Sequence, residues 1–131
     1  MCAMQNMKMS MMCYYDARIA VSPYGGLFNP LTLEPFCTYY GFKAFGKLYA
    51  LGTQVECSTD GEDLYALAAS DGKTGGIVIS NLGEGCEINI PLKNNANAYL
   101  IDEDNCFAEI KINENSVVLE KNQVIYIETI L

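Results

Sequence analysis

The chain has 131 residues and carries 16 Asp and Glu against 8 Lys and Arg, a net charge of −8. At this length, one compact domain with a substantial core is the default. The negative charge repels phosphate backbones and anionic lipids, so we expect no nucleic acid and no membrane as partner. The absence of His excludes Ser-His-Asp and Cys-His catalysis and leaves only Cys or oxygen atoms as metal ligands.

Charge and aromatic residues are unevenly distributed along the chain. Residues 1–52 contain two acidic and four basic residues, which leaves a net charge of −10 for residues 53–131. The first segment also contains ten of the fourteen aromatic residues and all six Met. These contrasts predict two segments of different origin with a boundary at Gly52.

The N-terminus reads as a helix end followed by a buried strand. Met1, Met4 and Met7 stand at helical spacing. The apolar run over 10–15 is typical of a strand that is buried on both faces of a parallel sheet. The Pro, Gly and Asn residues of 22–30 then predict a loop.

One long helix is predicted over residues 34–51. Thr32 or Glu34 can cap it, Pro35 suits its first turn, and Gly52 ends it. Its clearly polar residues are Thr38, Lys43 and Lys47. Because apolar side chains extend nearly all the way round, the pattern predicts an apolar helix that is buried on more than one side.

From residue 54 onward, the hydrophobic period changes to two, as expected of strands. Turn residues such as Asp60-Gly61 and Asn113-Glu114-Asn115 separate the runs. About eight short strands are predicted, over 54–59, 62–70, 76–82, 86–92, 97–102, 106–112, 116–120 and 123–130. This rhythm indicates a mainly β fold built as an antiparallel sandwich or barrel, and we favour a sandwich.

The six Cys residues are never closer than eleven positions, so the C-x-x-C spacing of zinc and redox sites is missing. Their even number would permit disulfides. Four of them stand within apolar or alternating runs, where a free thiol behaves as a small hydrophobic residue; they are Cys13, Cys37, Cys86 and Cys106. We therefore favour reduced core thiols over a disulfide framework.

Targeting signals are not visible in the sequence. The start, MCAMQNMKMS, has no continuous apolar region followed by a cleavage site. No apolar run approaches the roughly 20 residues that span a bilayer. We expect a cytoplasmic protein, although a parent protein could have carried a signal that this chain lacks.

The stretch MMCYYDARIAVSPYGGLFNPLTLEPFCTYYGFKAFGKLYALG resembles the end of the catalytic (β/α)8 barrel of clan-A glycoside hydrolases, especially family 39 and xylosidase- or arabinofuranosidase-like proteins. The resemblance implies that residues 1–52 are the remnant of the last barrel strand, loop and helix. Residues 53–131 would be the C-terminal β-sandwich that follows such a barrel. Glycoside hydrolysis needs two carboxyl groups, and the resemblance places both upstream of Met1.

The resemblance also implies candidate substrate-binding residues for a complete parent protein. Since the carboxyl end of a barrel strand faces the active site, Tyr15, Asp16, Arg18 and Tyr24 could line a sugar pocket. For the isolated chain, the favoured alternative is an ion pair between Asp16 and Arg18 that holds the loop. No catalytic residue is predicted in this chain.

Other candidate chemistry is weak. The turn Asp102 to Asn105 could hold Ca²⁺ through clustered oxygens, but it lacks the spacing of a calcium loop, and a solvated turn is favoured. The pairs Gly25-Gly26 and Gly75-Gly76 match no phosphate-binding loop and are assigned to turns and bulges. We expect no metal and no cofactor.

The sequence therefore favours a non-catalytic ancillary sandwich that braces the barrel of a glycoside hydrolase-like protein. A carbohydrate-binding module and a subunit of a split glycoside hydrolase are the alternatives. The expected partners are a catalytic barrel, in the same parent or separately encoded, and a second copy of the chain. The second copy would associate through residues 1–52, because loss of a barrel would expose their apolar side chains.

Overall fold

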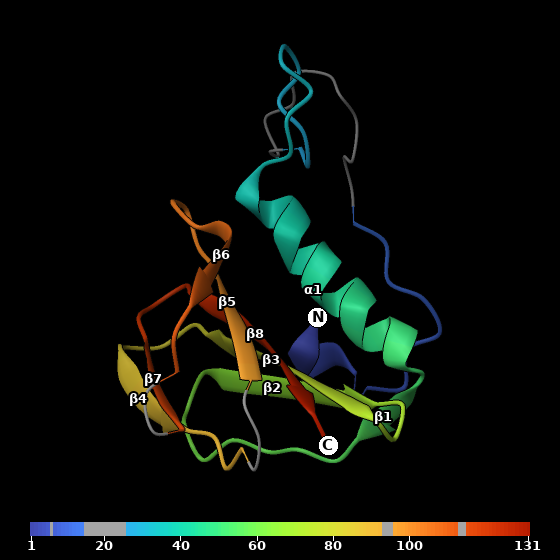
Figure 1. The fold of residues 1–131 in the computed structure, drawn as a ribbon. Coiled ribbons are helices and arrows are strands. Elements are labelled where there is room, and N and C mark those ends of the chain that lie inside the picture. Colours follow the sequence, from blue (N-terminus) through green and yellow to red (C-terminus); the bar gives the residue numbers. More distant parts are fainter. Residues whose placement is uncertain (6, 15–25, 93–95, 113–114) are drawn as a thin grey trace.

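The computed structural model describes residues 1–5, 7–14, 26–92, 96–112 and 115–131. It is mainly β, with one α-helix and two antiparallel sheets (Figure 1). The larger sheet has six strands in the order β1-β2-β3-β8-β5-β6, and the smaller one pairs β4 with β7. The strands are β1 (Thr53–Val55), β2 (Leu64–Ser70), β3 (Thr74–Asn81), β4 (Cys86–Asn89), β5 (Ala96–Ile101), β6 (Cys106–Ile110), β7 (Ser116–Leu119) and β8 (Val124–Ile130).

All eight strands lie where the two-residue period predicted them, with ends that differ by a few residues. Alternation sends successive side chains to opposite faces of the large sheet. On β3, Val78 belongs to the core beneath the helix, whereas Ile79 belongs to the core beneath β4 and β7. The large sheet is therefore the middle layer, between the helix α1 (Cys37–Leu51) and the small sheet.

The helix begins and is buried differently from the prediction. It starts at Cys37 with Phe36 as its N-cap, and no side chain caps it. The Thr32 hydroxyl instead donates to the Glu34 carboxylate within the preceding loop. Gly52 ends the helix with a φ of 84°, as predicted.

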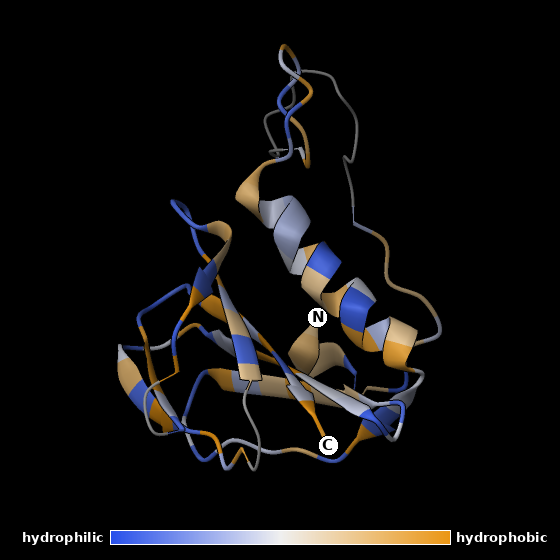
Figure 2. Cartoon of the chain, viewed as in Figure 1, coloured by the Kyte–Doolittle hydropathy of each residue, from blue (hydrophilic) through white to orange (hydrophobic). Residues whose placement is uncertain are grey.

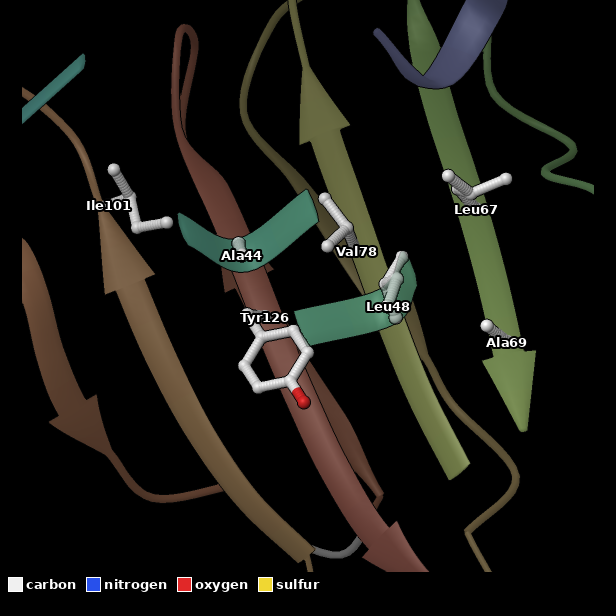
Figure 3. Packing of buried hydrophobic residues seen from close by; sticks show 7 residues of the cluster. All are labelled: Ala44, Leu48, Leu67, Ala69, Val78, Ile101 and Tyr126. Atoms are coloured by element: carbon white, nitrogen blue, oxygen red, sulfur yellow. The ribbon is translucent and has the colours of Figure 1, made fainter. Parts of the chain in front are cut away.

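The expectation of a long apolar helix buried on more than one side is not supported. Only Ala44 and Leu48 of its 15 residues are buried, and they pack on the large sheet (Figure 3). Tyr49 is 82% exposed, and Figure 2 shows hydrophilic segments alternating with hydrophobic ones along α1. The apolar composition came from aromatic residues that lie partly exposed on its flanks, such as Tyr39 and Phe42.

The glycine pair in β3 allows the helix to approach the sheet, which corrects its assignment to a turn or bulge. Gly75 and Gly76 lie inside the strand, paired with both β2 and β8. A Cβ on Gly76 would stand 2.7 Å from Leu48 Cδ2 and 3.0 Å from Leu51 Cδ1. The bare backbone of Gly76 is therefore what gives α1 its close seat.

The N-terminal segment also differs from the prediction. A short 3₁₀ helix spans Cys2–Met4, and residues 10–14 are exposed and form no strand. Cys2 packs against the core beneath α1. Residues 7–12, which we call the Met-rich stretch, then run beside the helix (Figure 1). Met4, Met9 and Tyr49 line the same groove.

Besides the apolar core between them, the two sheets are linked by the hydrogen bonds of a buried amide. Asn81, at the end of β3, is 1% exposed. Its Nδ2 donates to the Leu119 carbonyl at the end of β7 (3.0 Å) and to the Glu84 carbonyl (2.8 Å), and its Oδ1 accepts from the Gly83 N–H (3.0 Å). A buried polar group that satisfies its partners in this way fixes how the layers meet.

Candidate functional site

The four residues predicted to bind substrate lie outside the described residues. The structure therefore does not test Tyr15, Asp16, Arg18 or Tyr24. The described residues on either side of them lie against the first half of α1. Tyr14 contacts Phe42 edge to face with ring centroids 5.0 Å apart, and Phe28 lies 5.4 Å from Tyr39.

The densest group of functional side chains in the described residues lies between α1 and the strands β5, β6 and β8. Four rings form it, and we call it the aromatic cluster: Tyr40, Tyr99, Phe107 and Tyr126. Phe107 stacks on Tyr99 at 4.6 Å, on Tyr126 at 5.9 Å and on Tyr40 at 6.2 Å between ring centroids. The ring faces are turned toward one another, so the cluster works as a joint between helix and sheet.

A β-bulge places Phe107 at the centre of this cluster. Leu100 pairs with Ala108 and Ile101 pairs with Cys106, which leaves Phe107 as the extra residue in β6. Its φ of 71° lies in the left-handed region, where a bulky side chain is strained. Bulges re-aim side chains, and this one directs the Phe107 ring onto Tyr99.

Two lysines of α1 and one carboxylate of β8 complete the cluster. Lys43 Nζ lies 4.7 Å from the Phe107 ring centroid, and Lys47 Nζ lies 5.2 Å from that of Tyr126. Lys47 also pairs with Glu128 Oε2 at 2.9 Å, the same oxygen that accepts from the Tyr126 hydroxyl at 2.6 Å. The hydrogen bond from Tyr126, with the Lys47 ammonium, lowers the pKa of Glu128. Burial and the Glu128 carboxylate raise the pKa of Tyr126.

A disulfide lies beside the aromatic cluster, next to Phe107, and it corrects the expectation of reduced core thiols. Cys37, the first residue of α1, is bonded to Cys106, the first residue of β6. Cys13 is free but exposed, and Cys86 is free and half-buried. Cys37 and Cys106 are 69 positions apart in sequence, and no spacing signal marks them as a pair.

The acidic turn is organised by its own hydrogen bonds. Asp102 accepts from the backbone N–H groups of Asp104 and Asn105 and from the side chains of Asn105 and Gln123. Burial alone would raise the pKa of Asp102, but these hydrogen bonds together lower it. Both carboxylate oxygens are thus engaged in the turn, and within the described residues no group of three Cys, Asp or Glu side chains is placed to hold a metal ion.

Two further hollows are apolar grooves. One, of about 460 Å³, is lined by the Met-rich stretch and by Phe45 and Tyr49 of α1. The other, of about 560 Å³, lies between residues 57–61 and β4 and includes Asp60 and Glu87. Both of these carboxylates are exposed, and the lining of that groove contains no aromatic ring on which a sugar could stack.

The contacts of the aromatic cluster hold α1 against the large sheet. Glu128, the carboxylate of the cluster, pairs with the Lys47 ammonium and accepts a hydrogen bond from the Tyr126 phenol. Glycoside cleavage instead needs two carboxyl groups that face one bond. Sequence reasoning missed the joint because its members come from four separate segments. Two signals were available: Lys43 and Lys47 stand four apart on the helix, and Tyr99 and Tyr126 fall inside strands.

The fold of this chain is similar to that of part of several solved structures. No protein-family model and no curated protein matches the chain. Among solved structures, it is similar to the glycoside hydrolase family 30 subfamily 8 xylanase Xyn30A from Clostridium acetobutylicum, with a TM-score of 0.66 and 19% identity over 82% of this chain. It is also similar to a GH30 endoxylanase from Clostridium papyrosolvens C71, with a TM-score of 0.64 and 17% identity over 81% of this chain.

A third similar structure is a conserved exported protein from Bacteroides fragilis, with a TM-score of 0.51 and 16% identity over 58% of this chain. The chain spans 31% and 30% of the two xylanase chains, within their C-terminal domain. These identities establish a shared fold. The similarity supports the resemblance to the C-terminal part of clan-A glycoside hydrolases, but it does not single out family 39. None of the helices in the described part is long and apolar enough to cross a membrane.

Proposed function

We propose that this chain is a non-catalytic, ancillary β-sandwich unit of a glycoside hydrolase-like protein and that it braces a catalytic barrel. The observation that carries the proposal is the fold match to the C-terminal domain of two xylanases over more than 80% of this chain. The occupied carboxylate of the aromatic cluster supports the non-catalytic part. The residues that resemble a barrel end supply the contact with the barrel.

The proposed contact surface is the outer side of α1 together with the Met-rich stretch. Met7 is 58% exposed, Met11 76% and Tyr49 82%. Surfaces of this kind usually mark an interaction site. At roughly 25 cal/mol per Å² of apolar area, covering them favours docking before the costs of association are counted.

The test is to sequence the DNA upstream of this reading frame and to produce the encoded protein with and without this chain. We expect a (β/α)8 barrel upstream, which hydrolyses aryl xylosides or related glycosides and loses thermal stability without the sandwich. The chain alone should release no aryl alcohol from any substrate. Turnover by the chain alone, or an upstream sequence that encodes no barrel, contradicts the proposal.

For the isolated chain, we propose that a second copy covers the same surface. Light scattering at micromolar concentration should then give a dimer or a higher oligomer. Met11→Lys with Tyr49→Lys should shift the mass toward the monomer, because each Lys would be buried unpaired. Val118→Lys is the matched control, since Val118 is 59% exposed on β7, away from α1. A monomeric wild-type chain contradicts this association.

A further inference from the structure

The disulfide joins the two parts of the structure that the core holds least. It links the first residue of α1 to the first residue of β6, which is an edge strand of the large sheet. Cys106 is exposed and Cys37 is half-buried, so a dissolved or protein-borne thiol can reach the bond. The disulfide is thus available for exchange while the protein is folded.

The first half of α1 is held by partly buried side chains. The fully buried residues of the helix, Ala44 and Leu48, both belong to its second half. Before them, Tyr40 packs against the core beneath the helix and stacks on Phe107, and Lys43 lies over the same ring. Tyr39 and Phe42 contact Phe28 and Tyr14, which belong to the N-terminal segment and not to the sheet. The helix start also has no side-chain cap, and such caps are worth about 1 kcal/mol.

The first half of the helix contains a weak point of its own. Gly41 stands inside α1, and a Cβ there would meet nothing within 4 Å; the same is true of Gly46 in the second half, where Ala44 and Leu48 are buried on the sheet. A glycine in a helix interior costs stability relative to Ala because it loses more backbone freedom on folding. No packing requirement explains this glycine, so its effect on the helix is to loosen it between Tyr40 and Phe42.

The partner strand is strained at the same place. Phe107, next to Cys106, holds a left-handed φ of 71°, a conformation that persists only when its surroundings impose it. The disulfide on one side and the three stacked rings on the other are what impose it. Releasing Cys106 removes one of these two constraints.

We propose that the Cys37–Cys106 disulfide is a redox-operated clamp, whose reduction releases residues 37–43 from β6 while residues 44–51 stay on the sheet. A thiolate of a dithiol reductant attacks Cys106 Sγ, forms a mixed disulfide and displaces the Cys37 thiolate, which takes up a proton. The second thiol of the reductant then attacks the reductant sulfur of the mixed disulfide. This attack closes a disulfide within the reductant and releases the Cys106 thiolate, which takes up a proton. Two protein thiols and one oxidised reductant result, so two electrons are transferred.

The released state has a defined consequence for the surface. Tyr40 no longer stacks on Phe107, and the Lys43 ammonium leaves the Phe107 ring while it stays beside Tyr40 on the same helix. The loop over 26–36, which leads directly into Cys37, loses its fixed end. The reverse exchange, with the disulfide form of the same dithiol as the oxidant, restores the Cys37–Cys106 bond. The device therefore sets the position of that loop through the redox state of its surroundings, and it does not depend on the proposed function.

Hydrogen exchange of the full-length chain tests the clamp, measured by mass spectrometry before and after treatment with dithiothreitol. We expect amides of residues 38–43 to exchange about tenfold faster or more after reduction, because local opening replaces a tethered state. Amides of 46–51 should change by less than about twofold, since the core holds that half. Thiol counting on the same samples should show two additional free thiols.

Three variants make the experiment decisive. Cys37→Ser with Cys106→Ser should exchange like the reduced protein and should not respond to dithiothreitol. Cys13→Ser with Cys57→Ser removes the two exposed free cysteines and should keep the full response. Gly41→Ala should reduce the response about fourfold, because it stiffens the weak point.

Three outcomes overturn the proposal. Equal exchange over 38–43 in the oxidised and reduced protein would show that the disulfide holds nothing that the rings do not hold. Equal acceleration over the whole of α1 would show a structural cross-link whose loss loosens the entire fold. Failure of dithiothreitol to release two thiols from the folded chain would equally contradict an exchangeable bond.

Discussion

Replacing Asn81 by Ala should lower the free energy of unfolding, because Asn81 hydrogen-bonds one sheet to the other. The substitution deletes hydrogen bonds to the carbonyls of Leu119 and Glu84 and from the Gly83 N–H. Glu84 is exposed and its carbonyl can turn to water, but Leu119 is fully buried and Gly83 is half-buried. Each buried group left without a partner costs about 1–3 kcal/mol, so we expect a loss of about 2–4 kcal/mol.

Such a loss is a large share of the 5–15 kcal/mol typical of a domain. Urea unfolding followed by circular dichroism measures it directly, and the melting temperature should fall by about 6–12 °C. Asn89→Ala is the matched control, because Asn89 is exposed on β4; it should change the free energy of unfolding by less than about 0.5 kcal/mol. An Asn81→Ala loss no larger than that of the control would refute the reasoning that one amide joins the sheets.

Three further predictions concern close packing, backbone strain and pH. Gly76→Ala should destabilise the chain by about 1–3 kcal/mol, because the new methyl group presses on Leu48 and Leu51. Gly75→Ala should cost less, since its methyl group meets the exposed Leu131 side chain. Equal urea midpoints for the two variants would contradict this expectation. Leu33→Gly should be neutral or stabilising by up to about 1 kcal/mol, because Leu33 has a φ of 63° and its side chain is 56% exposed. Leu31→Gly, at a neighbouring exposed position, should destabilise the chain instead. A fall in melting temperature for both variants would contradict the strain at Leu33. The folded-state pKa of Glu128 lies below its ordinary value of 4.5, so its contribution to stability is present above pH 4.5 and is lost as the pH falls through the lowered folded value. Glu128→Gln should therefore make the free energy of unfolding depend less on pH between 3 and 5, and parallel curves for variant and wild type would show that the pairing with Tyr126 and Lys47 adds nothing.

The strands could be predicted because short runs of β-type residues are separated by turn residues. Alternation is visible where one face of a strand is exposed, as in β4, whose residues alternate between half-buried and exposed. In β3 both faces are buried, since Val78 and Ile79 belong to separate cores, and its central residues are continuously apolar. The end of the helix was equally accessible, because a left-handed residue at Gly52 is a local requirement.

The features that could not be predicted depend on contacts between distant parts of the chain. The helix α1 begins at Cys37 and not at residue 34, because the predicted caps Thr32 and Glu34 hydrogen-bond to each other in the loop. The disulfide needed the pairing of β5 with β6 and the bulge at Phe107, neither of which leaves a local pattern. Gly76 looked like a turn residue because its purpose is set by Leu48, a residue of another element.

The helix α1 also bears on how the two predicted segments are connected. Composition divides the chain at Gly52, yet Ala44 and Leu48, which precede that boundary, are 0% and 2% exposed and belong to the core of the sheet that follows it. The other side of the same helix keeps Tyr49 exposed. The boundary in composition at Gly52 is therefore not the boundary of the folding unit, because the core of the sheet extends back into α1. Under the proposed function, the exposed side of the same helix is the part left for contact with a barrel.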